Sequence, residues 1–116
     1  MGKIETMDCQ GKSGDTYTFN MWSINASFME VKCVYIYAKE LKDSLQPIYV
    51  GQTEHLATRL QEHKDGDSKS DICIQKSGAT HILVHQESSK QTRIDIETDI
   101  RNNPNYTWSC NRQEKP

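Results

Sequence analysis

The sequence predicts one α+β domain in which helices flank a small antiparallel sheet. Three observations support this fold class. The chain has 116 residues, the size of a single ordinary domain. Short apolar runs with the two-residue alternation of strands recur along it, and segments with helical spacing follow them. Hydrophobic residues make up only 34% of the chain, so the core must be small and come from these segments.

The N-terminal part predicts a flexible segment followed by a strand. Residues 1–14 are polar and indicate a flexible N-terminus, so we expect the folded domain to cover residues 15–116. Within residues 15–25, Tyr17 and Phe19 alternate with polar residues, which is the period of a half-buried strand. We therefore expect the first strand of the sheet here.

Three further strands are predicted, two of them joined by a loop. Residues 31–38 are rich in valine, isoleucine and tyrosine and suit a central strand. The polar residues 39–47 predict a loop, after which a short strand covers residues 48–50. Two apolar strands joined by a modest loop usually pair antiparallel. Residues 80–86 alternate as well and predict another strand.

Two helices are predicted with different start signals. Thr53 is a good N-cap for a helix over residues 54–64. A Ser-x-x-Gln capping box that starts at Ser88 opens a second helix over residues 88–102. The pattern of residues 67–77 is ambiguous and leaves a short helix as one alternative.

The charge balance argues against a strongly basic, sequence-independent nucleic-acid binder. The formal net charge is −2, from 14 basic and 16 acidic residues, whereas such binders carry an excess of lysine and arginine. No stretch reaches the roughly 20 apolar residues that span a bilayer, and the N-terminus lacks the apolar region of a signal peptide. We therefore expect an intracellular, cytoplasmic protein with no membrane partner.

The four cysteines predict free structural thiols. No two of them form a Cys-x-x-Cys pair, and their spacings match no common zinc site. Cys33 and Cys73 lie in apolar runs, where free cysteine behaves as a small buried hydrophobe. We expect reduced thiols rather than zinc ligands or a disulfide.

An ordered set of side chains along the chain resembles the GIY-YIG nuclease family. The set consists of Tyr35 in a Cys-Val-Tyr run, Tyr49 in a Tyr-Val-Gly-Gln-Thr run, Arg59, His63 and Glu97. The resemblance extends over about residues 32–107. It implies a three-stranded antiparallel sheet of the GIY-YIG type, to which the strand near residues 15–24 is added. It also implies a metal-dependent endonuclease, with DNA favoured over RNA as the substrate.

The resemblance assigns each residue a part in one-metal phosphodiester hydrolysis. Tyr35 is the expected base, and Tyr49 positions the attacking water or the phosphate. Arg59 carries a permanent charge suited to phosphate oxygens, and His63 donates a proton or binds phosphate. Glu97 would hold the Mg²⁺ or Mn²⁺ ion, with waters and phosphate oxygens completing its shell. A tyrosine hydroxyl has an ordinary pKa near 10, so a nearby metal or cation must lower it if tyrosine is the base.

Ordinary structural roles stay open beside these. The tyrosines could simply pack in the sheet, and Arg59 could pair with Glu62 or Glu54. His63 could be a polar residue at a helix end, and Glu97 could pair with an arginine one turn away. The alternative function is a catalytically inactive module that binds nucleic acid or protein. Because the chain has no separate recognition domain, we expect target recognition to come from loops, a partner protein or a homo-oligomer.

Overall fold

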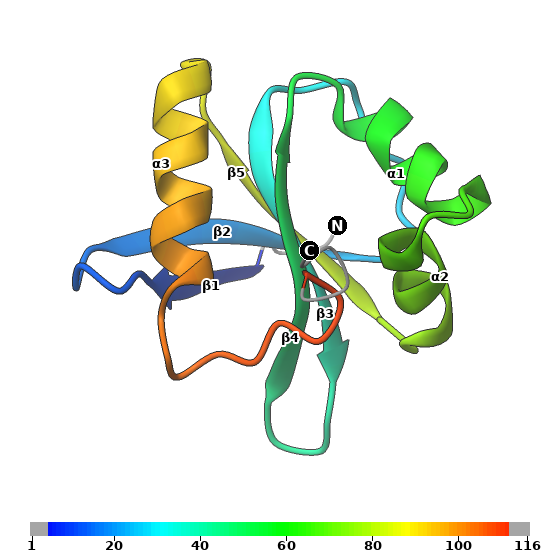
Figure 1. Ribbon diagram of the computed structural model, residues 1–116, viewed down its shortest axis with the longest axis horizontal. Helices are drawn as coiled ribbons and strands as arrows, with labels where there is room; N and C mark the ends of the chain where they lie inside the picture. The colour runs from blue at the N-terminus through cyan, green and yellow to red at the C-terminus, as the bar shows by residue number, and fades with distance from the viewer. Residues whose placement is uncertain (1–4, 112–116) are drawn as a thin grey trace.

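The structure is a computed structural model that describes residues 5–111 of the chain. It has an α+β fold with a five-stranded antiparallel sheet and three helices (Figure 1). In chain order the elements are β1 (Glu5–Gln10), β2 (Thr16–Ser23), β3 (Cys33–Glu40), β4 (Leu45–Thr53), α1 (Leu56–Asp65), α2 (Lys69–Lys76), β5 (His81–Gln86) and α3 (Lys90–Arg101). The order of strands across the sheet is β1-β2-β5-β3-β4.

Helices cover both faces of the sheet and create two separate cores. Helix α3 packs on one face, and α1 and α2 pack on the other (Figure 1). Because side chains alternate along a strand, Val34 and Ile36 of β3 face α3, whereas Tyr35 and Tyr37 face α1 and α2. The prediction of β3 as a central strand is confirmed, since it pairs with β5 on one side and β4 on the other.

The expected flexible N-terminus was wrong for its described part. Residues 5–10 form β1, which pairs with β2 from Glu5↔Met21 to Gln10↔Thr16. The sheet therefore has five strands rather than four. The connection between β1 and β2 is held by Asp99 of α3, whose carboxylate accepts from the Ser13 amide at 2.8 Å. Such a long-range contact leaves no local signal in a polar segment.

The loop predicted over residues 39–47 is much shorter in the structure. Strand β3 continues to Glu40 and β4 begins at Leu45, so a tight hairpin joins them. Pro47 lies inside β4, next to an irregularity in the register. Proline is tolerated there because β4 is the edge strand and proline has no amide proton to donate.

The helix starts differ from the predicted ones, although the helices themselves are confirmed. Thr53 is the last residue of β4, and the side chain of the N-cap residue of α1 makes no capping bond. Instead, the Glu30 carboxylate accepts from the Thr58 backbone amide at 2.9 Å. The N-cap of α3 is Ser89, not Ser88. The short helix left open within residues 67–77 is present as α2. No helix within residues 5–111 has the length and apolar character needed to cross a membrane.

The expectation of four free thiols is wrong for two cysteines. Cys73 of α2 and Cys110 form a disulfide with a Cα–Cα distance of 5.5 Å. Cys9 and Cys33 are free, as expected, and both are buried, which was expected of Cys33 but not of Cys9 in the predicted flexible N-terminus. The disulfide fastens a C-terminal segment that runs along the outer edge of β4, where Asn111 hydrogen-bonds both the amide and the carbonyl of Val50. Sequence spacing missed this pair because its partners lie 37 residues apart.

Candidate functional site

Three tyrosines and one histidine form a compact cluster between the sheet and α1. We define the aromatic cluster as Tyr35 and Tyr37 of β3, Tyr49 of β4 and His63 of α1. Ring centroids of the tyrosines lie 5.1–5.9 Å from that of His63. The strands bring the rings together, because Tyr35 and Tyr37 share one face of β3 and Tyr37 is paired with Tyr49.

A hydrogen bond joins two of the predicted site residues directly. The Tyr35 hydroxyl lies 2.8 Å from Nε2 of His63. Both side chains are completely buried. His63 does lie in the last turn of α1, as the structural alternative required, but its ring is buried. Burial of a polar ring is costly unless its nitrogens are bonded, and both nitrogens of His63 have partners.

Asp71 is the second partner of His63, and sequence reasoning did not single it out. Its Oδ1 lies 2.8 Å from Nδ1 of His63. Asp71 is the third residue of α2 and forms a capping box with Ser68. The Ser68-x-x-Asp71 pattern at a helix start could have indicated the capping box. It could not have indicated His63, because that contact depends on how α2 packs against α1.

The electrostatics of the site keep Tyr35 and His63 neutral. Burial raises the pKa of Tyr35 well above its ordinary value, and the Arg59 guanidinium only partly opposes this. Burial also lowers the pKa of His63, against the effect of the Asp71 carboxylate. Partial burial acts against the ionisation of Asp71, but hydrogen bonds from His63 and Ser68 outweigh it and hold its pKa below the usual value. Asp71 is therefore the ionised member of the chain of bonds.

Arg59 lies on the solvent side of the aromatic cluster. Its guanidinium interacts with the Tyr35 hydroxyl and also with Glu62, at 3.0 Å between Nη1 and Oε1. The Arg59 side chain is 40% exposed. The surface pairing that we left open is therefore present together with the expected position beside Tyr35. A charge so placed can meet a ligand from solvent while it acts on the pKa of the buried hydroxyl.

Glu97 comes from a different layer than the other four predicted residues. It lies on α3, which covers the opposite face of the sheet, and its side chain is partly exposed. One turn earlier, the buried Arg93 donates from Nε to the Gln52 side chain at 2.9 Å, so this part of α3 lies against the end of β4. Within residues 5–111, no three His, Cys, Asp or Glu side chains form a group that could hold a metal ion.

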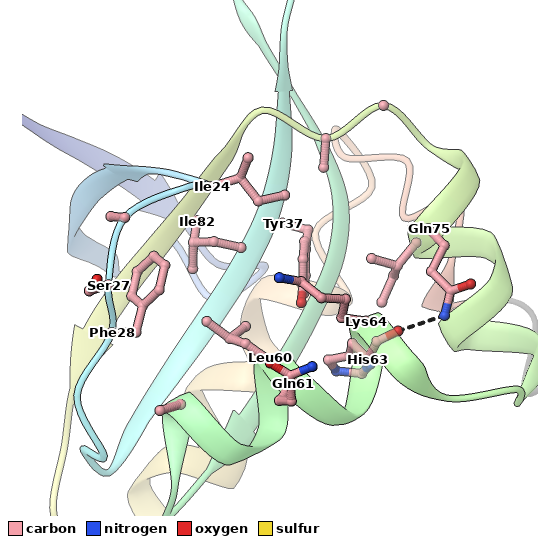
Figure 2. Close-up of a pocket in the computed structure, with 15 residues that line it drawn as sticks. Ile24, Ser27, Phe28, Tyr37, Leu60, Gln61, His63, Lys64, Gln75 and Ile82 are labelled. Atoms are coloured by element: carbon pink, nitrogen blue, oxygen red, sulfur yellow. Dashed lines mark hydrogen bonds between the residues drawn. The ribbon is translucent and has the colours of Figure 1, made fainter.

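A cavity of about 580 Å³ adjoins the aromatic cluster on the side of α1 and α2. Figure 2 shows Tyr37, His63, Phe28 and Ile82 among its lining side chains. The Gln75 amide at its edge donates to the backbone carbonyls of His63 and Gly66, at 2.8 and 2.9 Å. These bonds fix the end of α1 to α2.

No protein-family model matches the chain, and no curated protein or solved structure shows significant similarity to it.

Proposed function

We propose that this protein is a metal-dependent endonuclease that hydrolyses phosphodiester bonds in nucleic acid, with DNA as the first substrate to test. One observation carries the proposal: the Tyr35 hydroxyl bonds His63 at 2.8 Å and also interacts with the Arg59 guanidinium. The Tyr35 hydroxyl oxygen thus lies beside His63, which can accept its proton, and near the permanent positive charge of Arg59. This combination suits attack by water on a phosphate, which needs both proton removal and charge stabilisation.

The pairing of Tyr35 with His63 answers the difficulty posed by the high pKa of tyrosine. A free phenolate at Tyr35 would be rare near neutral pH, because burial raises the pKa of this hydroxyl. The half-exposed Arg59 side chain must move aside for water to reach the buried Tyr35 hydroxyl. With His63 behind it, Tyr35 then takes the proton of the attacking water while its own proton passes to Nε2. The water oxygen bonds to phosphorus, the bond from phosphorus to the 3′ oxygen breaks, and that oxygen takes a proton from solvent. A 5′-phosphate and a 3′-hydroxyl result.

Arg59 and Tyr49 suit the binding of the phosphate itself. The Arg59 fork offers several N–H donors and keeps its charge at any working pH. It reaches solvent, whereas Tyr35 behind it is fully buried. Tyr49 packs against His63 and lies close enough to Arg59 to act on its pKa. We assign Arg59 to the non-bridging phosphate oxygens and Tyr49 to positioning the phosphate or water.

Glu97 is the residue that we assign to the metal ion. A hard ion such as Mg²⁺ can bind through a single carboxylate, with waters and substrate oxygens as its other ligands. When bound, such an ion supplies positive charge beside the phosphate oxygens. Arg93 bonds Gln52 near the end of β4, so the helix that carries Glu97 adjoins the strand of Tyr49.

The second candidate is a binding module that keeps this fold without catalysis. The placement of Glu97 on the opposite layer from the aromatic cluster favours it, as does the net charge of −2. A module of this kind would bind nucleic acid or a protein but would not need the proton-transfer pair. The hydrogen-bonded chain from Tyr35 through His63 to Asp71, with Arg59 beside the Tyr35 hydroxyl, is the observation against it.

The direct test is a cleavage assay with matched variants. Plasmid, branched and single-stranded DNA, and RNA, are incubated with the protein and Mg²⁺ or Mn²⁺. We expect cleavage by the wild type and by Tyr37→Phe, since neither nitrogen of His63 bonds Tyr37. We expect losses of about 10²–10⁴-fold for Tyr35→Phe, Arg59→Ala and Glu97→Ala, because each removes proton transfer or charge stabilisation in the transition state.

The outcomes separate the two candidates. Cleavage that survives all three substitutions would come from a contaminant and not from this site. A wild-type protein that binds DNA but cuts no substrate with either metal would establish the binding module. Circular dichroism and melting temperatures of each variant show whether a lost activity reflects a lost fold.

A further inference from the structure

We infer that Asp71 is a positioning residue of this site, which holds His63 in the one tautomer and orientation in which Nε2 accepts the Tyr35 proton. The catalytic meaning of this inference rests on the proposed nuclease function. Its structural content does not, because it concerns the direction of two hydrogen bonds. Asp71 does not meet the reacting atoms and acts only through His63.

The chemistry of the three groups decides the direction of the bonds. An ionised carboxylate only accepts hydrogen bonds, so the 2.8 Å contact from Asp71 requires the proton of His63 to be on Nδ1. A neutral imidazole carries one N–H, and Nε2 is then bare. The 2.8 Å contact at Nε2 must therefore be donated by the Tyr35 hydroxyl. The bonds run in one direction, from Tyr35 to His63 to Asp71.

Asp71 is itself held in place by groups that leave Oδ1 for His63. Its Oδ2 faces the Ser68 amide at 3.4 Å, and the Ser68 hydroxyl accepts from the Asp71 amide at 3.0 Å. Gly66 makes room for the carboxylate, since a β-carbon there would lie 1.9 Å from Oδ2. The side chain is only 14% exposed. The capping box of α2 thus stabilises the start of the helix and also holds the carboxylate that bonds His63.

The carboxylate also stabilises the charge that the reaction would create. When His63 accepts the Tyr35 proton it becomes an imidazolium in a fully buried position. An unpaired charge in such a position is costly, whereas a carboxylate in hydrogen-bond contact favours the charged form. An amide in place of the carboxylate would remove this stabilisation. It could also donate to Nδ1 and reverse the tautomer, which is the reason such a change is severe in a hydrogen-bonded catalytic triad.

The first test measures the tautomer without any assay of activity. Nitrogen-15 spectra of labelled histidine distinguish a protonated ring nitrogen from a bare one, and the His63→Gln variant identifies the signal of His63. We expect Nδ1–H with bare Nε2 in the wild type and in Asp67→Asn, which makes the same charge change on an exposed residue. We expect Asp71→Asn to shift the proton toward Nε2. A wild-type Nε2–H tautomer, or an unchanged spectrum in Asp71→Asn, would overturn the inference.

The second test uses kinetics to distinguish positioning from simple stability. For Asp71→Asn we expect kcat to fall about 10²–10⁴-fold with KM nearly unchanged, because proton transfer and not binding is affected. Asp71→Glu keeps the carboxylate and should recover part of the loss. Equal melting temperatures with equal kcat in wild type and Asp71→Asn would refute the role. If the wild type cuts no nucleic acid, the proposed function fails, while the nitrogen-15 result still decides the role of Asp71.

Discussion

The phenol of Tyr35 occupies the space where a side chain of Gly51, its partner across the β3–β4 pair, would lie. A β-carbon at position 51 would lie 2.8 Å from the Tyr35 hydroxyl oxygen and 2.9 Å from the ring carbon that bears it. Glycine is required here for space, because Gly51 is not among the residues with positive φ. Packing against Tyr35 therefore explains the glycine of the tyrosine-x-glycine motif in β4. It leaves the room in which the Tyr35 hydroxyl can reach His63.

Gly51→Ala should disable the site more than it destabilises the fold. The added methyl group must push the Tyr35 ring away, and a displacement of about 1 Å at a reacting group can cost about 10²-fold in rate. Overpacking of this kind costs about 1–3 kcal/mol in stability. Gly14→Ala is the control, since its positive φ makes alanine strained while no atom lies within 4 Å of the added carbon. Equal loss of cleavage in both variants would show that stability alone is responsible.

Removal of the Glu62 charge should change little. The Arg59–Glu62 pair is formed by side chains that are 40% and 56% exposed, and pairs so exposed contribute about 0–1 kcal/mol. We expect Glu62→Gln to shift the free energy of unfolding by less than about 0.5 kcal/mol and to retain cleavage. Urea unfolding and the cleavage assay measure the two quantities. A large loss of activity would mean that Glu62 is needed to orient Arg59 toward Tyr35.

Stability should fall as the pH drops below neutral. The pKa of His63 is lower in the folded state than its ordinary value of 6.5, so the unfolded chain binds more protons between the two values. Stability therefore declines as the pH falls from about 6.5 toward the lower folded value. Asp71 adds a second loss below its ordinary value of 3.8, because its folded pKa is also lowered and its stabilising effect disappears when it is protonated.

Melting temperatures between pH 7 and pH 5 measure this effect. His63→Gln should flatten the decline, whereas His85→Gln, at a partly exposed position on β5, should leave it intact. Cleavage should be lost only at the lower end of this decline, where the pH reaches the lowered pKa of folded His63, since a protonated His63 has no lone pair for the Tyr35 proton. The titratable and charged groups that face His63 are Tyr35, Tyr37, Tyr49, Arg59, Glu62 and Asp71. An identical pH profile in His63→Gln would assign the effect to another of these groups.

Reduction of the Cys73–Cys110 disulfide should destabilise the fold substantially. The bond closes a loop with a sequence separation of 37 residues, for which the loss of chain entropy in the unfolded state corresponds to about 4 kcal/mol. Urea unfolding with and without reductant measures the difference. The double variant Cys73→Ser with Cys110→Ser should match the reduced wild type and should not respond to reductant. A wild type that unfolds at the same urea concentration in both conditions would contradict this expectation.

The same measurement bears on where the protein works. Disulfides form and persist mainly in oxidising compartments. The cytoplasmic location predicted from the sequence would therefore leave the chain in its reduced, less stable form. Activity of the reduced protein at physiological temperature would be consistent with that location. A protein that unfolds on reduction would point to an oxidising one.

Local periodicity was sufficient to predict much of the architecture. The alternation in residues 15–25 and 80–86 and the β-branched run at 31–38 indicated β2, β5 and β3, because a strand buries alternate side chains whatever its neighbours are. Strand β1 was not predicted, because it is polar and depends on its pairing with β2. The same reason applies to the ends of β3 and β4, which continue as strands only because each pairs with the other.

The sequence by itself determined the α+β class and the central strand, and its resemblance to the GIY-YIG family singled out the candidate side chains: Tyr35, Tyr49, Arg59, His63 and Glu97. Only the tertiary structure decided which of them meet. It joins Tyr35 to His63 and brings in Asp71 from the next helix. It carries Glu97 on the opposite layer and closes a disulfide that spacing did not reveal. The physical reason is that periodicity reports the surroundings of one segment, whereas hydrogen bonds between segments depend on how helices and strands pack in three dimensions.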